Sequence, residues 1–274
     1  MKQRRTFSQF WRQVGVELRE NRKTFIVYSI LRALILITIV TQAVHQNYEN
    51  VFLGVVTLFL LIAPSVVQAT FKVEFPSLLE IILLLFIFAT EILGEIGAFY
   101  VRVPYWDTIM HTLNGFLCAA IGFSLVDILN RQHRAQFDLS PFFMALVAFC
   151  FSMTIGVLWE FFEYGMDRLF LTDMQKDTVI HTIASTLLDP TRSNISVVVP
   201  DILDTTVNGS SLGLGGYLDV GLYDTMEDLF VNFLGAAVFS TLGYFYVKYH
   251  RRSIVPRLVP TPQREDKYES PAES

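Results

Sequence analysis

The stretch SLLEIILLLFIFATEILGEIGAFY, from residue 77 to residue 100, decides the fold class of this chain. An α-helix rises about 1.5 Å per residue, so a helix of this length crosses a hydrocarbon layer of about 30 Å. An isolated strand is excluded, because its unpaired backbone groups would face lipid. The stretch therefore predicts a membrane-spanning helix, and this helix carries two acidic residues, Glu91 and Glu95, near one end.

The rest of the chain has the same character. Hydrophobic residues make up 52% of the sequence, charged residues only 17%, and mean hydropathy is +0.43. A water-soluble domain carries about 25% charged residues, so the composition excludes a soluble enzyme. We expect an all-α, polytopic bundle of about six transmembrane helices. The predicted spans are residues 24–42, 51–70, 77–100, 108–129, 140–166 and 225–249.

The distribution of Lys and Arg predicts the orientation. Residues 1–23 are strongly basic, the last span ends in VKYHRR, and residues 167–223 are acidic on balance. By the positive-inside rule both termini are cytoplasmic and the long 167–223 loop is extracytoplasmic. We therefore divide the chain into a cytoplasmic amphipathic segment (1–23), a transmembrane domain (24–249) and a Pro-rich cytoplasmic tail (250–274) predicted to be disordered. The expected location is a cell membrane, most simply a prokaryotic plasma membrane.

Ionisable residues gather at one predicted depth, the outer third of the membrane. A charged group inside a bilayer costs at least about 2.5 kcal/mol, so such residues usually face a bundle interior and mark a site. So many carboxylates in a small volume need either raised pKa values or a bound cation. The residues concerned are Glu91, Glu95, Asp107, His111, Glu160, Glu163, Asp224 and Asp228.

A structural alternative exists for part of this set. Asp107, Asp177 and Asp224 each begin a similar stretch, DTIMHTL, DTVIHTI and DTMEDLF, and Asp is a favoured helix N-cap. Capping does not explain His111 or Asp228, which lie one turn further along. These two residues are therefore the stronger candidates for a shared site.

Small and amide side chains on the fourth and last spans predict where these helices meet. Asn114 and Gly115 on one helix mirror Asn232 and Gly235 on the other. Small residues allow close approach, and an Asn can form a hydrogen bond between helices. A close approach here would bring the turns that carry the candidate site residues together, with Asn114, Asn232, Glu91 and Glu95 supporting the site.

The middle stretch, DTVIHTIASTLLD, is expected to form an amphipathic helix in the outer loop. In that helix His181 is a surface residue, and residues 173–188 cover the site as a movable segment.

Three motifs in order, YWDTIMHTLNGF, VLWEFFEYGMD and YDTMEDLFVNFLGA, resemble the YjdF-like family of uncharacterised prokaryotic membrane proteins. A looser likeness exists to VanZ-like proteins, some of which are linked with resistance to glycopeptide antibiotics. The resemblance implies a fold and site positions and names no substrate. The matching positions are Trp106, Asp107, His111 and Gly115, then Trp159, Glu160 and Glu163, then Asp224, Thr225, Asp228, Asn232, Gly235 and Ala236.

The first functional hypothesis is a metal-dependent hydrolase or transferase acting on a lipid or lipid-linked substrate. One imidazole with several carboxylates suits Zn, Mn, Fe or Mg better than copper. The predicted metal ligands are His111, Asp228, Glu160, Asp107 and Asp224.

Glu160 and Glu163 are the predicted catalytic residues, with Glu163 as general base toward a metal-bound water. The first alternative is a non-catalytic protein that binds a lipid or an antibiotic. A proton- or cation-coupled transporter is less favoured, because the inner halves of the fourth and last spans are almost wholly apolar. We expect the lipid bilayer as partner and no nucleic acid. The sequence alone identifies neither the substrate nor the oligomeric state.

Overall fold

The computed structural model describes residues 22–131, 139–249 and 254–262, and these residues are mostly helical. The chain divides into two compact units, the first made of residues 1–153 and 232–274 and the second of residues 154–231. The predicted amphipathic segment lies, apart from its last two residues, outside the described residues.

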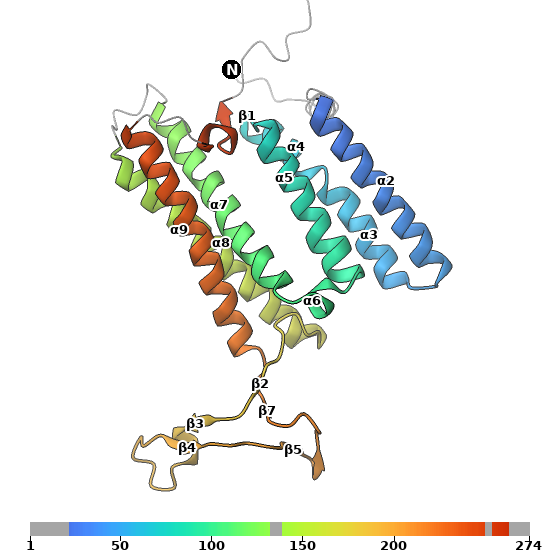
Figure 1. Cartoon of the computed structure of the whole chain (residues 1–274), viewed down its shortest axis with the longest axis vertical. Helices are drawn as coiled ribbons and strands as arrows, with labels where there is room; N and C mark the ends of the chain where they lie inside the picture. The colour runs from blue at the N-terminus through green and yellow to red at the C-terminus, as the bar shows by residue number, and fades with distance from the viewer. Residues whose placement is uncertain (1–21, 132–138, 250–253, 263–274) are drawn as a thin grey trace, which may run out of the picture. The chain divides into compact units, whose positions relative to one another are not determined.

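Six helical stretches in the described part are long and apolar enough to span a membrane, which confirms the six-span prediction. Two of the six consist of two consecutive helical segments. Figure 1 shows the helices coloured in chain order. The spans are α2 (Arg22–Val44), α3 with α4 (Tyr48–Leu60 and Ala63–Phe71), α5 with η1 (Ser77–Phe88 and Ala89–Ile96), α7 (Trp106–Arg131), α8 (Pro141–Phe170) and α9 (Leu222–Tyr249).

The stretch at residues 77–100 is less regular than its composition suggests. After α5 the chain winds into a π-helix, η1, that contains both Glu91 and Glu95. It then turns at Ala98, whose φ of 55° is left-handed, into the short helix α6 (Phe99–Arg102). Because π-helical turns shift the direction of side chains and recur at functional sites, η1 changes where the two acids point.

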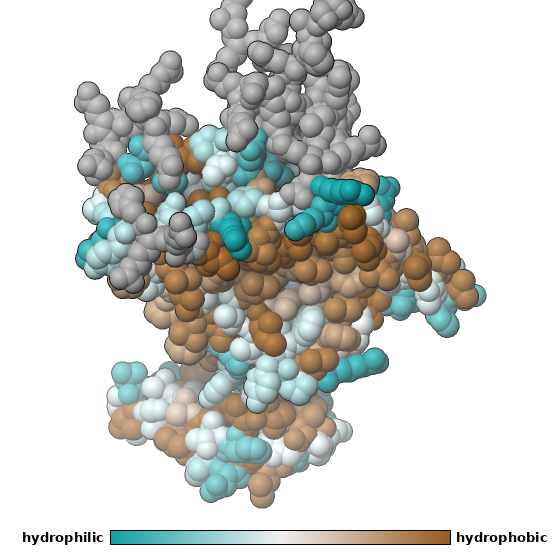
Figure 2. Space-filling model, turned by 45° about the horizontal axis from the view of Figure 1, so that its top comes forward, coloured by the Kyte–Doolittle hydropathy of each residue, from teal (hydrophilic) through white to brown (hydrophobic). Residues whose placement is uncertain are grey.

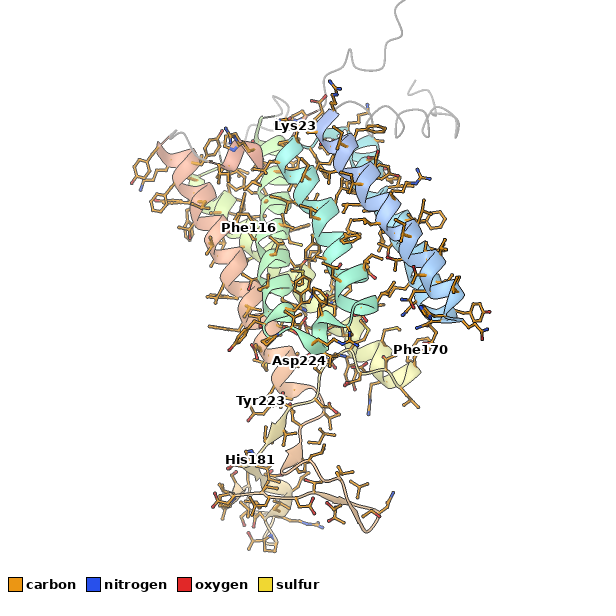
Figure 3. All side chains as sticks on the ribbon, turned by 45° about the vertical axis from the view of Figure 1, so that its right-hand side comes forward. Lys23, Phe116, Phe170, His181, Tyr223 and Asp224 are labelled. Atoms are coloured by element: carbon orange, nitrogen blue, oxygen red, sulfur yellow. The ribbon has the colours of Figure 1, made fainter. Side chains whose placement is uncertain are left out.

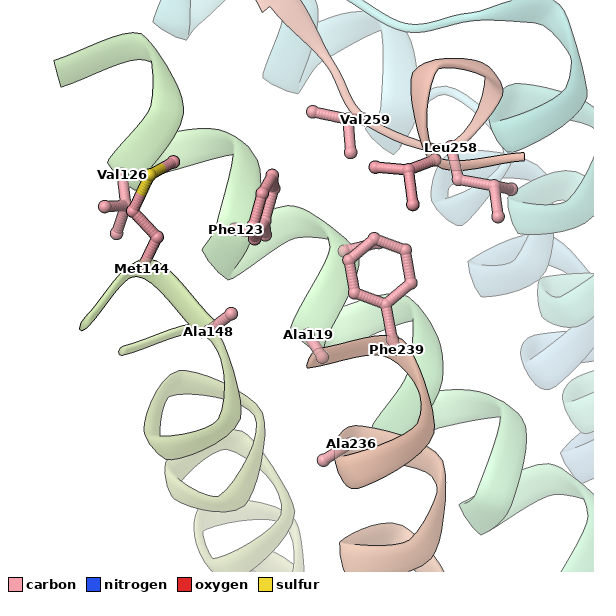
Figure 4. Close-up of a cluster of buried hydrophobic side chains, with 11 residues drawn as sticks. Ala119, Phe123, Val126, Met144, Ala148, Ala236, Phe239, Leu258 and Val259 are labelled. Carbon is pink, nitrogen blue, oxygen red and sulfur yellow. The ribbon is translucent and has the colours of Figure 1, made fainter. Parts of the chain in front are cut away.

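The core of the first unit lies where α7 meets the first half of α8 and the last part of α9. Phe123, Met144 and Phe239 are fully buried there, and the two phenylalanine rings contact each other edge to face (Figure 4). A second cluster, around Leu31 and Ile35, packs α2 against α3, α5 and η1.

Residues 254–262, which we call the C-terminal strap, are part of this core. Val255 in η3 (Val255–Arg257) and Leu258 are buried in the α7–α9 cluster. The strap ends as β8 (Thr261–Pro262), which pairs antiparallel with β1 (Val73–Glu74). The prediction of a disordered tail is therefore wrong for residues 254–262, because the strap buries apolar side chains against the helices; residues 263–274 lie outside the described residues.

The second unit contains the last turns of α8, the first turns of α9 and the intervening residues 171–221. The amphipathic helix predicted at 177–189 does not form. Five of the six residues from Thr178 to Ile183 are β-branched, which explains this, because such side chains favour extended backbone. The elements here are β2 (Val179–Ile180) paired with β7 (Tyr217–Leu218), β3 (Ile183–Ser185) paired with β4 (Val197–Val199), β5 (Thr206–Val207) paired with β6 (Ser210–Ser211), and the 3₁₀ turn η2 (Thr186–Leu188).

Hydrophobic side chains cover much of the helical surface, as expected for a chain in contact with lipid. Figure 2 shows them as a brown area on the visible face. On α2 alone, Ile30, Ile37 and Val40 are more than half exposed. The protein is therefore a multi-pass membrane protein, and its exposed apolar helix faces match the bilayer.

Candidate functional site

Three buried acidic residues, Glu160, Glu163 and Asp228, form a cluster that we call the carboxylate triad. Glu160 and Glu163 are three residues apart, so they share one face of α8. Asp228 lies on α9, and the three residues are only 4%, 7% and 2% exposed. One carboxylate oxygen of each lies within 4.8 Å of those of the others. The second unit thus brings together acids that the sequence places on different spans.

The triad has a neighbour, Trp159, that the sequence matched to a motif position but to which it gave no role in the site. The indole N–H of Trp159 donates a hydrogen bond of 2.9 Å to Oε1 of Glu163. The spacing of four residues in WEFFE was the available signal, because residues i and i+4 are neighbours on a helix.

Asp224 lies one turn before Asp228, at the start of α9 (Figure 3). It is not the N-cap that was predicted. Asp219 fills that role, because its carboxylate accepts hydrogen bonds from the backbone N–H groups of Leu222 and Tyr223. Asp224 instead accepts a bond of 2.8 Å from the backbone N–H of Lys176, and one of its oxygens lies within 4.8 Å of an Asp228 oxygen.

A turn at residues 172–176 ties the end of α8 to the start of α9. Asp167, one turn beyond Glu163, accepts hydrogen bonds from the Thr172 hydroxyl and from the backbone N–H groups of Met174 and Gln175. The Gln175 side chain then donates to the Thr225 hydroxyl on α9. The turn therefore fixes the separation of the two helices next to the triad.

In the first unit, Asp107 and His111 lie in the first two turns of α7. Asp107 is the second residue of this helix, so it lies within the first turn rather than before it as an N-cap. Its Oδ1 is 3.4 Å from Nε2 of His111, and the two side chains are 29% and 11% exposed. Asp107 and His111, four residues apart, therefore form a close pair on one face of α7.

The predicted close approach of α7 and α9 is present within the first unit. The Asn114 side chain donates to that of Asn232 at 3.4 Å, and Asn232 is only 1% exposed. A Cβ on Gly115 would collide with the Asn232 carbonyl oxygen, and one on Gly235 with that of Thr112. The backbones can approach this closely because both positions are glycine.

The remaining predicted residues differ in their environments. Glu91 is half-buried and Glu95 is exposed, both in η1. His181 is exposed among the short strands, and its Nδ1 lies 3.0 Å from the Ile202 carbonyl oxygen. Figure 3 labels both His181 and Asp224, which lies at the start of α9. His181 is thus a surface residue, as expected. Asp177 begins no helix, and burial together with the negative charges of Asp173, Asp219 and Asp167 raises its pKa.

The comparisons with known proteins agree with this architecture. The model of the predicted membrane protein family DUF2238 matches residues 27–249. The chain belongs to this family. It corresponds to the YjdF-like resemblance, whereas the VanZ-like likeness rests on the motif pattern alone.

An uncharacterised protein of Thermotoga maritima is similar to this chain, with 28% identity over 144 residues. The match covers 53% of this chain and 66% of the relative, so the chain spans just under two thirds of that protein's length. No solved structure matches.

Proposed function

We propose that the carboxylate triad binds a divalent cation within the membrane, and that the protein is a metal-dependent hydrolase or transferase acting on a lipid or lipid-linked substrate. The observation that carries the proposal is the separation of under 4.8 Å between buried carboxylate oxygens from two membrane-spanning helices. At an effective dielectric constant of about 20, each ionised pair at that distance repels by roughly 3–4 kcal/mol. A divalent cation would reverse the sign of this interaction.

The donor set favours particular cations. Carboxylate oxygens with at most one imidazole suit Mg, Mn, Fe or Zn. Glu160 and Asp228 are the proposed first ligands. The sequence pattern adds His111 as the predicted imidazole ligand. Asp224 would support Asp228 from the preceding turn of α9.

A cation at this position would polarise a phosphoryl or carbonyl oxygen and lower the pKa of a bound water. The chain's own groups would do the rest. Glu163, which lies in the triad, could bind the cation or accept a proton from the water. A lipid-borne substrate fits this position, because α8 and α9 are spans with exposed apolar side chains.

The test is the metal content of the detergent-purified protein, measured by mass spectrometry before and after reconstitution with Zn, Mn or Mg. We expect about one ion per chain in the parent, because the triad oxygens lie within 4.8 Å of one another and so form a single cluster of ligand atoms. Asp228→Asn and His111→Ala should both lose it while keeping their helical circular dichroism. Glu49→Gln, which changes an exposed acid in the first turn of α3, is the matched control and should retain it.

Absence of metal in the reconstituted parent would refute the proposal. The triad would then have to be largely protonated, and the lipid- or antibiotic-binding role would become the better hypothesis. A positive result would justify a screen of phospholipids and lipid-linked sugars for hydrolysis or group transfer.

A further inference from the structure

Arg168 is an exposed cation in the last turn of α8, a helix that ends at Phe170 (Figure 3). Its guanidinium carbon Cζ lies 5.9 Å from the centre of the Tyr164 ring, one turn earlier, in a cation–π contact. Within the described residues the Arg168 side chain has no hydrogen bond or ion pair. None of the five N–H donors of its guanidinium is therefore used by the chain.

An unpaired arginine is unexpected in the second unit, because acids are abundant there. Asp and Glu far outnumber Lys and Arg in residues 154–231. Lys176 does contact an acid, since its Nζ lies 3.9 Å from Oδ2 of Asp173. Asp167, which precedes Arg168 in the chain, already accepts three hydrogen bonds from the turn at residues 172–176. The donors of Arg168 therefore remain available to an anion from outside the chain.

Arg168 belongs to a row of exposed side chains that runs beside the acids of α8. Phe161, Tyr164 and Arg168 are spaced i, i+3 and i+7, so they share one face of the helix, and all three are exposed. Glu160 and Glu163 begin a buried row with the same spacing, one residue earlier. The two rows are about 100° apart around the helix, at 3.6 residues per turn. A molecule that lies along the exposed row therefore passes next to the triad.

The order of side chains along the exposed row matches an anionic lipid. Phe161 presents an apolar ring further into the span, and Arg168 places a positive charge at the helix end, where lipid head groups lie. A guanidinium forms paired, charge-assisted hydrogen bonds to phosphate oxygens. The row is continuous with the exposed apolar surface of a membrane span, so a lipid reaches it without leaving the bilayer.

We propose that Arg168, held over the Tyr164 ring, binds the phosphate of an anionic phospholipid whose acyl chains lie against α8 beside the triad. This lipid is the substrate class of the proposed enzyme. The substrate assignment rests on the proposed function, whereas binding of the lipid at Arg168 requires no metal ion.

The experiment measures dissociation constants of the delipidated full chain for phosphatidylglycerol and for phosphatidylcholine with identical acyl chains, by native mass spectrometry. Arg168→Gln removes the charge, and Tyr164→Leu removes the ring and keeps the charge. Arg192→Gln is the matched control, because Arg192 is an exposed arginine of the same unit outside the membrane-spanning helices. Circular dichroism and metal content are measured for every variant.

We expect the parent and Arg192→Gln to bind phosphatidylglycerol more tightly than phosphatidylcholine. Arg168→Gln should weaken phosphatidylglycerol binding about fivefold, the size typical of one basic residue at an anionic surface, and change phosphatidylcholine binding little. Tyr164→Leu should weaken it about twofold, as for the loss of an exposed cation–π contact. Inorganic phosphate at the same concentration should not displace the lipid, because it has no acyl chains to contact α8.

Two results would refute the lipid site. An unchanged ratio of the two constants in Arg168→Gln means that this residue does not recognise the head group, and an equal loss for both lipids makes it a general interface anchor. Displacement of phosphatidylglycerol by inorganic phosphate would also overturn the inference, in favour of a site for free phosphate.

Failure of the proposed function gives a different result. A parent that holds metal but shows no preference dependent on Arg168 keeps the proposed function and loses this inference. A parent that shows the preference and binds no metal keeps the lipid site and loses the enzyme, and with it the assignment of this lipid as the substrate.

Discussion

Replacing Leu258 with Ala should strongly destabilise the first unit, although this residue lies beyond the last membrane span. Leu258 is 2% exposed in the C-terminal strap and packs into the cluster that contains Phe123 and Phe239. Leu-to-Ala changes at such buried positions cost about 2–5 kcal/mol, from lost burial and from the cavity left behind. The strap has little secondary structure, so most of this loss should appear as detachment of the strap from the helices.

The matched control is Ile254→Ala in the same strap, because Ile254 is 48% exposed. A substitution at an exposed position usually changes stability by no more than about 0.5 kcal/mol. Unfolding of the detergent-solubilised protein, followed by circular dichroism, gives the difference in stability between the two variants. Protease cleavage within residues 254–262 should also accelerate in Leu258→Ala alone. Equal unfolding temperatures and equal cleavage rates in the two variants would show that the strap is not packed as described.

Two further predictions concern other parts of the chain. Gly235→Ala should destabilise the α7–α9 contact by roughly 1 kcal/mol or more, the size of overpacking effects, because its Cβ would collide with the Thr112 carbonyl oxygen. Gly165→Ala is the control, because its Cβ would meet nothing within 4 Å. In the same unfolding assay this control should be neutral or slightly stabilising. Hydrogen bonds from the Thr191 hydroxyl and nearby backbone N–H groups hold the pKa of Asp189 below its ordinary value. Ionised Asp189 therefore stabilises the folded state above the unfolded-state pKa of an Asp, about 3.9, and this stabilisation is lost as pH falls through the pKa of Asp189 in the folded protein. Amide hydrogen exchange of residues 186–197 should accelerate at acid pH in the parent, and this pH dependence should be lost in Asp189→Asn. If exchange in the parent stays constant as pH falls, the hydrogen bonds to Asp189 do not stabilise this segment.

The six spans could be predicted because a membrane imposes a length and an apolar composition that a single sequence displays. The packing of the strap could not be predicted, because Val255 and Leu258 belong to a short apolar segment interrupted by prolines within an otherwise polar tail. Their burial depends on a surface assembled by α7, α8 and α9. The helix predicted at residues 177–189 does not form, for a different reason. The apolar spacing there fits a helix, and the β-branched residues, which favour extended backbone, were given too little weight.

Part of the candidate site was predictable, because the spacing of residues along a single helix can be read from the sequence. Spacing along one helix placed Glu160 and Glu163 on a common face, and no tertiary information was needed. The approach of Asp228 to within 4.8 Å of them depends on how α8 and α9 pack and on the turn between them. The helix cap was misassigned to Asp224, because Asp219, Gly221 and Asp224 offer several possible starts for α9.

The acids at the ends of α8 and α9 form two layers with different sources of stabilisation. In the outer layer, Asp167 and Asp224 accept hydrogen bonds from backbone N–H groups of the intervening turn. Such donors stabilise a carboxylate without any added ion. One turn further in, the backbone N–H groups of both helices are used within the helices themselves. Acids at that depth must depend on side chains, on protons or on a cation, and this is why the inner layer, and not the outer one, is where we place the metal.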